Sequence, residues 1–581
     1  MKEDSHSPPR GSPTSGEGKI SLRVDQPVEG CEVTTHAFYR SSDGDIDDDD
    51  FRLKFGWFKS KSKRSCANKQ CARIGNGEGN VVLLMATVDC AVCVRQGLSS
   101  DDAQYCTLDC FRHAWGQHRQ LHDTRSKTTR QSAEDIERAK EMAVQTPPRR
   151  ADETWSVLEG AKTYTPSTAD VGHVLRVECT PLFRTGEEAG PSKFMETNIV
   201  LPFPPLAPKR QMVPSIKDER PPSRLRFLGG FRVLTYNVLA EIYATRQMYP
   251  YCPMWALNWS FRKQLLQKEL QLYNADILCL QEVQADHYKS YFQPMMAAWG
   301  YDGIFQKKTR ESMGFEGKVD GCAMFYRKTR FFLKEQYTVE FNEAANDLVQ
   351  SMWTNFEMAY PTASNHERET YQASINRIRQ RLVRDNIAQV VVFDVLPLHN
   401  EARKANSSLP CICVTNVHIF SNPEFPDVKL WQTHTLLEQL EHLAHSRRLP
   451  VIICGDFNSE PSSAVYELLS QNHVRSDHSD LKHLSDVLHM TKLTHPMSLD
   501  SAYASVFGDE PEYTNYTGNW VGVCDYIWFS SDTLLAVAGL QVHPPEVLKA
   551  YARTCLPNCQ FVSDHVPVCV DFCFKGLNGR Y

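Results

Sequence analysis

The chain has 581 residues, of which 41% are apolar, so it can bury a sizeable core over about two to four domains. Its formal net charge of −6 excludes a strongly basic protein, and any nucleic-acid surface must be local. The sequence has no run of roughly eighteen apolar residues and no signal peptide, which argues against membrane spanning and secretion. The 19 cysteines are an odd number, divided between one tight cluster and apolar runs, which is typical of a reducing compartment. We expect a cytoplasmic protein without membrane attachment, with a nuclear pool as the alternative.

Composition divides the chain into five parts. Residues 1–19 are rich in Ser, Pro, Gly and charge and are predicted to be disordered. Residues 20–60 and 151–205 alternate apolar and polar positions in part, which predicts one small β-rich domain, a β-sandwich, interrupted by a zinc finger at 61–125. Residues 206–226 are proline-rich, which excludes a sheet interior or a helix and predicts a linker.

Residues 227–581 are expected to form the largest domain of the chain. Short runs rich in β-branched and aromatic residues, bounded by turn residues, predict strands. Leucines at helical spacing predict helices at Phe261–Tyr273 and Lys429–His445. Strands outnumber helices, which predicts a layered α/β domain with a mixed sheet or two packed sheets. The predicted strands are residues 231–237, 275–282, 321–327, 388–396, 411–418, 449–458, 524–530 and 565–572.

Polar side chains stand at the ends of these predicted strands. One such residue alone is ordinarily a turn or cap residue, but a series of six places indicates a common site. Hard carboxylate oxygens suit Mg²⁺, which also holds phosphate oxygens, so the series predicts metal-assisted phosphodiester cleavage. The series consists of Asn237, Glu282, His418, Asp456 with Asn458, Asp525, and Asp564 with His565.

Three of these places have predicted roles. Glu282 is expected to be the main Mg²⁺ ligand. Asp456 and Asn458 are separated by one residue and should project to the same side of an extended chain. Asp456 can then orient or deprotonate the attacking water while Asn458 donates to the phosphate. His565 can donate to the charge that develops on the phosphate, provided that Asp525 holds its ring.

The motifs TYN, LQE, NVH, GDFN, DYIW and SDHVP resemble the endonuclease/exonuclease/phosphatase superfamily from about Arg232 to Phe574. The resemblance implies a four-layer α/β sandwich, in which helices flank two packed mixed sheets. Intervening runs such as LCLQEVQADHY, GKVDGCAMFYR and YTNYTGNWVGVCDYIWFS are similar to the carbon-catabolite-repressor-four-type poly(A) deadenylases. This similarity implies a Mg²⁺-dependent 3′–5′ exoribonuclease that shortens the poly(A) tails of mRNA and releases 5′-AMP.

Two alternatives remain at this stage. A phosphatase of the same fold would act on a nucleotide cofactor or a terminal RNA phosphate, in a pocket closed around one nucleotide. A non-catalytic scaffold would leave the function to the zinc finger. The scaffold is disfavoured because Glu282, Asp456 and His565 are all present.

The same resemblance implies roles for particular residues. The 3′-terminal adenine would lie between Pro423 and Trp520. Trp520 stands where the family has Phe and keeps a stacking face, and base stacking contributes about 1–3 kcal/mol. The run HIFSNP departs from the aromatic–Asp pair that usually precedes this proline. The implied catalytic residues are Asn237, Glu282, Asp320 in VDGCA, His418, Asp456, Asn458, Asn515 in TNYT, Asp525 and His565, with Asp564 beside His565.

A cluster of cysteines and histidines predicts two structural Zn²⁺ ions. Its four pairs give eight ligands at spacings that one turn or helix start can present, and zinc takes four ligands tetrahedrally. The pairs are Cys66 and Cys71, Cys90 and Cys93, Cys106 and Cys110, and His118 and His122.

The run CAVCVRQGLSSDDAQYCTLDCFRHAWGQHRQLH is similar to the six-Cys, two-His finger of methionine aminopeptidases and, more loosely, to MYND fingers. The similarity implies that pairs one and three share one zinc and that pairs two and four share the other. It also implies a protein-binding module in place of leucine-rich repeats. This module would be the dock for the partner deadenylase of the NOT complex.

Overall fold

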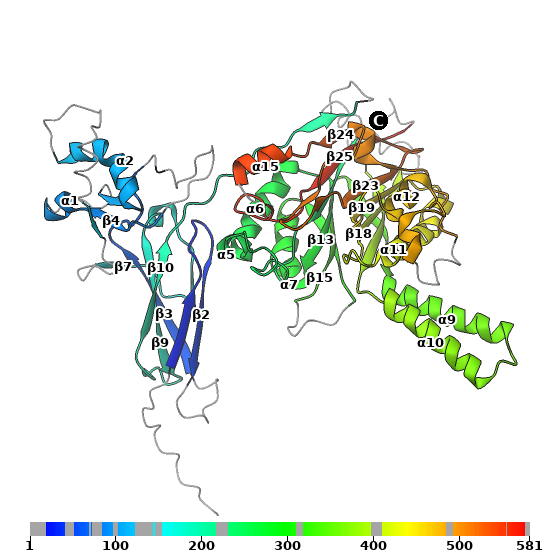
Figure 1. Ribbon diagram of the computed structural model, residues 1–581, viewed down its shortest axis with the longest axis horizontal. Coiled ribbons are helices and arrows are strands. Elements are labelled where there is room, and N and C mark those ends of the chain that lie inside the picture. Colours follow the sequence, from blue (N-terminus) through cyan, green and yellow to red (C-terminus); the bar gives the residue numbers. More distant parts are fainter. Residues whose placement is uncertain are drawn as a thin grey trace, which may run out of the picture. The chain divides into compact units, whose positions relative to one another are not determined.

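The computed structural model describes residues 19–40, 51–68, 71, 84–96, 103–122, 143–145, 154–216, 230–309, 318–396, 410–483, 492–552 and 555–575. The chain forms two compact units, residues 1–206 and 207–581 (Figure 1). The predicted disorder of residues 1–19 falls outside the described residues except at Lys19, which begins a strand.

The first unit contains a β-sandwich of a three-stranded and a four-stranded sheet. Trp57, Leu175 and Val177 form part of the core between the sheets. The chain leaves these sheets after residue 60 and returns to them at residue 155. The first sheet has the order β1 (Lys19–Val24), β2 (Val33–Arg40), β8 (Thr163–Tyr164), and the second β10 (Lys193–Ile199), β9 (Val174–Phe183), β3 (Phe51–Ser60), β7 (Trp155–Val157).

The inserted cysteine-rich module has a small sheet and two helices. The module extends beyond the predicted range of residues 61–125, because a strand after residue 125, β6, pairs with β4 in its sheet. Helix α2 begins after Thr107, whose hydroxyl accepts a hydrogen bond from the backbone N–H of Cys110. The elements are β4 (Val88–Cys90), α1 (Ala91–Gln96), β5 (Gln104–Tyr105), α2 (Leu108–His118) and β6 (Ala143–Gln145).

The second unit packs two mixed sheets face to face. Val233, Val414 and Ile452 lie in the apolar core that fills the space between them. The first sheet has the order β11 (Met212–Pro214), β24 (Leu534–Leu540), β25 (Val568–Phe574), β12 (Phe231–Asn237), β13 (Ile277–Gln284), β15 (Asp320–Arg327), β14 (Tyr301–Lys307). The second has the order β16 (Phe331–Glu340), β17 (Ile387–Val395), β18 (Cys411–His418), β19 (Val451–Asp456), β23 (Asp525–Ser530), β20 (Leu499–Ser501).

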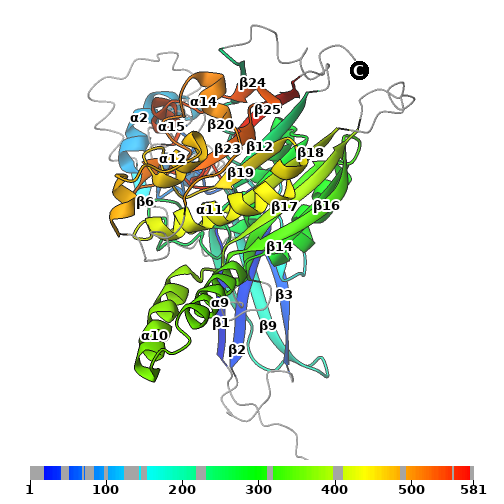
Figure 2. The ribbon, with the colours of Figure 1, turned by 90° about the vertical axis from the view of Figure 1, so that its right-hand side faces the viewer.

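Helices cover the outer faces of both sheets. Figure 2 shows α11 (Pro426–Leu443) and α12 (Ala464–Gln471) over the second sheet, against which Leu436 and Leu468 pack. On the first sheet, α6 (Trp259–Tyr273) packs beside β12, and Tyr236 donates to Glu269. The predicted four-layer α/β sandwich is therefore confirmed. The other helices are α5 (Met254–Leu257), α7 (Ala285–His287), α8 (Gln293–Ala298), α14 (Ala502–Phe507) and α15 (Pro545–Ala552).

A buried polar network joins the two sheets below the strand ends. Gln281 on β13 donates to Asn416 Oδ1 on β18 at 2.7 Å. The Asn416 amide donates to the backbone oxygens of Leu280 and Ala323, both at 3.1 Å. Buried polar groups are costly when unpaired, so these bonds favour one alignment of the two sheets.

Two elements of the second unit differ from the sequence prediction. The predicted linker 206–226 contributes β11, which pairs with β24 at the edge of the first sheet. An edge strand tolerates Pro214 because it forms a ladder on one side alone. The helical hairpin of α9 (Phe341–Ala359) and α10 (Asn365–Leu382), visible in Figure 1, was not predicted. In the part of the chain that is described, no helix is both long and apolar enough to cross a membrane.

Candidate active site and cysteine clusters

Two pairs of parallel strands place the predicted residues at one end of the sandwich. Strand β12 runs parallel to β13, and β18 runs parallel to β19 with His418 opposite Asp456. Parallel strands end at the same edge of a sheet, so their terminal side chains meet. The Asn237 amide bridges the sheets, donating to Glu282 Oε1 at 3.1 Å and to Asp456 Oδ2 at 3.0 Å.

Glu282 sits on strained backbone with a φ of +58°. Its carboxylate accepts a hydrogen bond from the Ala240 N–H at 2.9 Å. Burial, with the negative charges of Asp320 and Asp564, raises the pKa of Glu282 to about 7. A divalent cation would relieve this repulsion, so the carboxylate set fits the predicted Mg²⁺.

Asp320 is buried beside this carboxylate and has its own cationic partner. Lys308 Nζ lies 2.8 Å from Asp320 Oδ2, and the Tyr243 hydroxyl donates to Oδ1 at 3.0 Å. The nearby negative charges raise the pKa of Lys308 against the opposing effect of its burial. Asp320 therefore joins the site as half of a buried ion pair rather than as a turn residue.

His565 is held by Asp525, as the sequence predicted. Its Nδ1 lies 2.7 Å from Asp525 Oδ2, and its Nε2 lies 3.7 Å from Asp456 Oδ2 and 4.0 Å from Asp564 Oδ2. Burial lowers the pKa of His565, but the surrounding carboxylates together raise it well above its ordinary value. The three carboxylates therefore favour the protonated ring, whose Nε2–H can donate toward the centre of the site.

Asp564 is oriented by hydrogen bonds from Tyr249 and from Asn515, the first residue of β21. The Tyr249 hydroxyl donates to its Oδ2 at 2.9 Å and the Asn515 amide donates to the same oxygen at 3.2 Å. His418 lies on the other side of the site, with Nε2 at 3.6 Å from Asp456 Oδ2. All ten residues predicted to be catalytic thus lie in one hydrogen-bonded and charged region, whose catalytic roles stay predictions.

Asn458 does not follow the expected extended geometry. Its φ is +49°, so the chain turns directly after β19 instead of projecting both side chains to one side. Its N–H donates to Asp456 Oδ1 at 2.9 Å, and its side-chain amide donates to the Ile419 oxygen at 2.9 Å. Lys429 Nζ donates to the Asn458 carbonyl at 2.6 Å. The turn therefore fixes Asp456 through the backbone of Asn458.

The two predicted base-binding residues lie on different loops. Pro423 is exposed in the segment between β18 and α11. Trp520 is 38% exposed and lies in the turn between β21 (Asn515–Tyr516) and β22 (Val521–Gly522). Their pairing around an adenine stays a prediction.

Several residues of the site carried no signal in the sequence. Lysines and tyrosines are common on surfaces, so nothing marked Tyr243, Tyr249 or Lys308 as neighbours of catalytic carboxylates. Lys429 is the first residue of the predicted helix Lys429–His445, and nothing in the leucine pattern marks it as a neighbour of Asn458. Their places depend on how loops cross the strand ends, which one-dimensional patterns do not encode.

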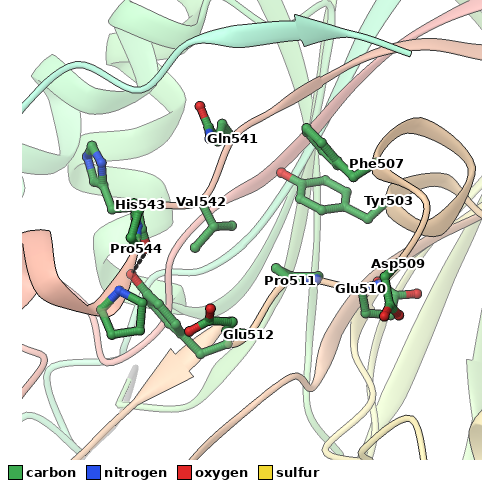
Figure 3. Close-up of a pocket in the computed structure, with 12 residues that line it drawn as sticks. Tyr503, Phe507, Asp509, Glu510, Pro511, Glu512, Gln541, Val542, His543 and Pro544 are labelled. Atoms are coloured by element: carbon green, nitrogen blue, oxygen red, sulfur yellow. Dashed lines mark hydrogen bonds between the residues drawn. The ribbon is translucent and has the colours of Figure 1, made fainter. Parts of the chain in front are cut away.

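A separate pocket of about 190 Å³ lies between α14 and the segment before α15 (Figure 3). Tyr503, Phe507 and Tyr513 line it, and Tyr513 donates to the backbone oxygen of His543 at 2.7 Å. None of the predicted catalytic or base-binding residues lines this pocket.

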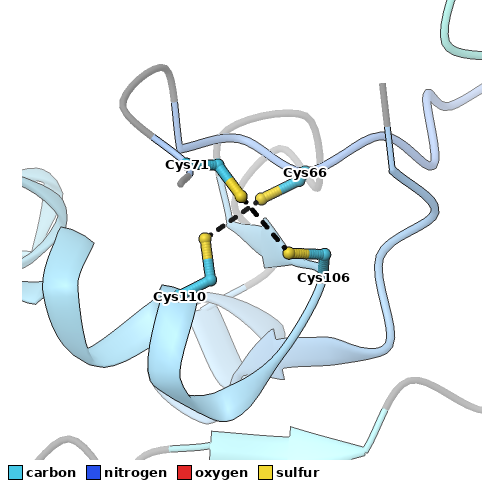
Figure 4. Close-up of side chains that lie close together, drawn as sticks. All are labelled: Cys66, Cys71, Cys106 and Cys110. Atoms are coloured by element: carbon cyan, nitrogen blue, oxygen red, sulfur yellow. Dashed lines mark hydrogen bonds between the residues drawn. The ribbon is translucent and has the colours of Figure 1, made fainter. Parts of the chain in front are cut away.

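The first cysteine cluster joins pairs one and three (Figure 4). The four sulfur atoms lie within 4.8 Å of one another, with 3.5 Å between Cys66 and Cys110 and between Cys71 and Cys106. Tetrahedral Zn–S bonds of about 2.3 Å place sulfurs about 3.8 Å apart. Burial raises the pKa of the Cys106 thiol to about 11 in the absence of a cation. These four thiols fit one Zn²⁺, which would hold them as thiolates.

The second cluster joins pairs two and four. Cys93 Sγ lies 3.4 Å from His118 Nε2 and Cys90 Sγ lies 3.5 Å from His122 Nε2. The four ligand atoms again lie within 4.8 Å, which fits a Zn²⁺ site without an open position. This grouping is the one that the resemblance to the aminopeptidase finger implied. In the described part of the chain, no two cysteines form a disulfide bond.

Residues 234–565 match the Endonuclease/Exonuclease/phosphatase family. The chain belongs to this family, and its predicted membership is confirmed. Within it, the chain is 32% identical to "Carbon catabolite repressor protein 4 homolog 1" of Arabidopsis thaliana over 95% of this chain and 97% of the relative. It is 30% identical to homolog 2 of the same plant over 95% and 98%.

Two further similarities cover the catalytic domain. "CCR4-Not complex 3'-5'-exoribonuclease subunit Ccr4" of Mycosarcoma maydis is 32% identical over 60% of this chain and 51% of that protein. The crystal structure of ANGEL2, a 2',3'-cyclic phosphatase, is 25% identical and covers 63% of this chain and 98% of its own, with a TM-score of 0.46. The two Arabidopsis relatives show that the chain is a homologue of carbon catabolite repressor protein 4 over nearly its full length.

Proposed function

We propose that the protein is a Mg²⁺-dependent 3′–5′ exoribonuclease that shortens the poly(A) tails of mRNA and releases 5′-AMP. The observation that carries this proposal is the bridge from Asn237 to both Glu282 and Asp456, beside the His565–Asp525 pair. The kinship with proteins named as exoribonuclease subunits supports RNA as the substrate class.

The residues have complementary roles in this reaction. Asp456 orients a water molecule and accepts its proton while the water oxygen bonds to phosphorus. The imidazolium of His565, held by Asp525, donates a hydrogen bond to the phosphate oxygen that gains charge. Mg²⁺ bound at Glu282 would supply further charge stabilisation for the phosphate. The P–O3′ bond breaks, the 3′-oxygen of the shortened RNA takes up a proton, and 5′-AMP leaves.

The test is hydrolysis of a 5′-labelled RNA ending in a run of A, beside one ending in a run of U, with Mg²⁺ present or omitted. We expect stepwise shortening of the A-tail that requires Mg²⁺, and slower removal of U. Asp456→Ala should reduce the rate about 10²–10⁴-fold. Asp532→Ala is the matched control, because Asp532 is an exposed aspartate in the turn after β23. Intact RNA in all conditions would refute the proposal and favour a phosphatase.

We further propose that the cysteine-rich module binds the partner deadenylase of the NOT complex, in the cytoplasm. Two closed four-ligand clusters suit a structural, protein-binding role, because neither offers an open position for chemistry. Co-purification from cells should recover the partner with the wild type and lose it with Cys93→Ser, while RNA hydrolysis persists. Equal recovery of the partner with the wild type and with Cys93→Ser would refute this assignment.

A further inference from the structure

The Trp520 indole is fixed by the protein although it is exposed. Its backbone N–H donates to Thr517 Oγ1 at 3.1 Å, and its carbonyl accepts the Thr517 N–H at 2.8 Å. A Cβ atom added to Gly522 would lie 2.6 Å from Trp520 Cζ2, so the ring packs against the glycine with no room for a side chain. One face of the indole is therefore held against the β21–β22 hairpin.

Glu460 holds the polar edge of the same ring. Trp520 Nε1 donates to Glu460 Oε1 at 3.1 Å, across 60 residues of sequence. A phenylalanine at position 520 would have no group to make this bond. This hydrogen bond, the Glu460 tether, therefore requires the tryptophan that stands where the resembled family has Phe.

The position of Glu460 is itself well determined. Its carbonyl accepts hydrogen bonds from the Ser463 N–H at 3.0 Å and from Ser463 Oγ at 2.6 Å, at the start of α12. Asp456 is the last residue of β19, and Glu460 follows it by four residues in the β19–α12 loop. The end of β19 and the loop after it thus deliver a predicted catalytic carboxylate and the acceptor that holds Trp520.

We propose that Glu460 is a positioning residue, which fixes the Trp520 indole as a preformed stacking surface for the 3′-terminal base. The proposal rests on the proposed exoribonuclease function and adds the element that orients the base site. Because Glu460 occupies the indole N–H, Trp520 presents its face alone to the base. Trp520 then binds the base by stacking and makes no hydrogen bond to the edge of the base.

Steady-state kinetics on the A-tailed RNA test this role. Glu460→Ala should raise KM about three- to tenfold, the effect of one net hydrogen bond, with kcat changed less than twofold. Glu460→Gln retains an acceptor oxygen and should keep KM within about twofold of the wild type. A lowered KM in Glu460→Ala would overturn the proposal, because it would mean that the carboxylate acts by repelling RNA phosphates.

A double-mutant cycle separates the tether from other effects of Glu460. Trp520→Phe keeps a ring but removes the N–H donor. In that background, Glu460→Ala should change KM by less than 1.5-fold, because the bond is already absent. If the fold-changes in KM of the two single variants multiply in the double variant, Glu460 does not act through Trp520.

A spectroscopic measurement tests the position of the ring without hydrolysis. Protein labelled with 5-fluorotryptophan has ten tryptophans, and the ¹⁹F resonance missing from Trp520→Phe identifies Trp520. This resonance should shift and sharpen in Glu460→Ala and stay in place in Glu460→Gln, because the untethered ring moves. An unchanged resonance in Glu460→Ala would refute the positioning role, even if the protein proved inactive on RNA.

Discussion

The candidate active site and the cysteine clusters both gather metal ligands, but they hold them differently. In the active site, Asn237, Tyr243 and Tyr249 hydrogen bond to the carboxylates, and the sheet cores fix the strands that carry them. In the module, the buried apolar cluster is small, and six of its ten members are the cysteines themselves. The active-site side chains are therefore held in place by the protein itself, whereas we expect the module to depend on bound Zn²⁺ for its fold.

The largest expected effect is the loss of zinc from the module. The wild type should contain two Zn²⁺ per chain by elemental analysis, and Cys106→Ser should contain one. Structural zinc supplies an apparent 10–16 kcal/mol in small fingers, so the substituted module should become sensitive to protease. The catalytic domain should keep its thermal transition and its RNA hydrolysis.

Cys555→Ser is the control for this experiment, since Cys555 lies in a loop of the catalytic unit outside both clusters. It should retain two Zn²⁺ and protease resistance. A protease-resistant module in Cys106→Ser that has lost its zinc would show that the small core suffices for folding.

The next effect is expected at Asn237, which joins the two sheets at the active site. Asn237→Asp replaces the donor that bridges Glu282 and Asp456 with a third negative group, so kcat should fall at least about 10²-fold. The thermal transition should shift little, because the sheets are held by their cores. Asn198→Asp, at an exposed asparagine of the sandwich, is the control and should keep full activity. Retained activity in Asn237→Asp would refute the bridging role.

The pH dependence of stability should also distinguish the candidate active site from the cysteine-rich module. Folding raises the pKa of Glu282 from 4.5 to about 7, so the folded state binds this proton more tightly. The contribution to stability is therefore greatest below pH 4.5 and is lost as the pH rises toward 7. With 1.36 kcal/mol per pH unit, the loss reaches about 3 kcal/mol at most.

Thermal unfolding without Mg²⁺ between pH 4.5 and 6.5 measures this loss. In that window the raised pKa of His565 keeps the imidazolium contribution in place, because folding lifts it above its ordinary value of 6.5. Glu282→Gln should flatten the decline, and Mg²⁺ should restore stability to the wild type at pH 7. If stability declines with pH in Glu282→Gln as it does in the wild type, the decline comes from the titration of another group.

The difference between the regions also explains what the sequence could predict. The strand-end residues Asn237, Glu282 and Asp456 were predicted because each follows a buried apolar run, and parallel strands carry them to one edge. The cysteine pairs were predicted from spacing alone. Lys308 and Tyr243 were not, because their place beside Asp320 depends on loop paths.

The helical hairpin was missed for a different physical reason. Helix α10 buries only Ile375, Ile378 and Leu382 among its 18 residues, so it lacks a wide apolar stripe. Local capping by Ser364 and Glu367 marks its start, but a polar helix of this kind gives a weak periodic signal. Strand β11 was missed because proline content outweighed its short apolar run.

The smallest expected effect lies in the hydrogen bonds that support the His565–Asp525 pair. Thr514 is fully buried, and its Oγ1 accepts the N–H groups of Cys524 at 3.0 Å and of Asp525 at 3.1 Å. Thr514→Val leaves both donors without this acceptor, which should destabilise the start of β23 by about 1–3 kcal/mol. A looser Asp525 holds the imidazolium less well, so kcat should fall about tenfold with KM unchanged.

The pH profile of kcat identifies the cause. With Asp525 displaced, the pKa of His565 should fall, and the alkaline limb of the profile should move to lower pH. Thr514→Ser keeps the hydroxyl acceptor and should restore both the rate and the profile. A slow Thr514→Val enzyme with an unmoved alkaline limb would mean that the hydroxyl supports the fold of β23 and not the charge of His565.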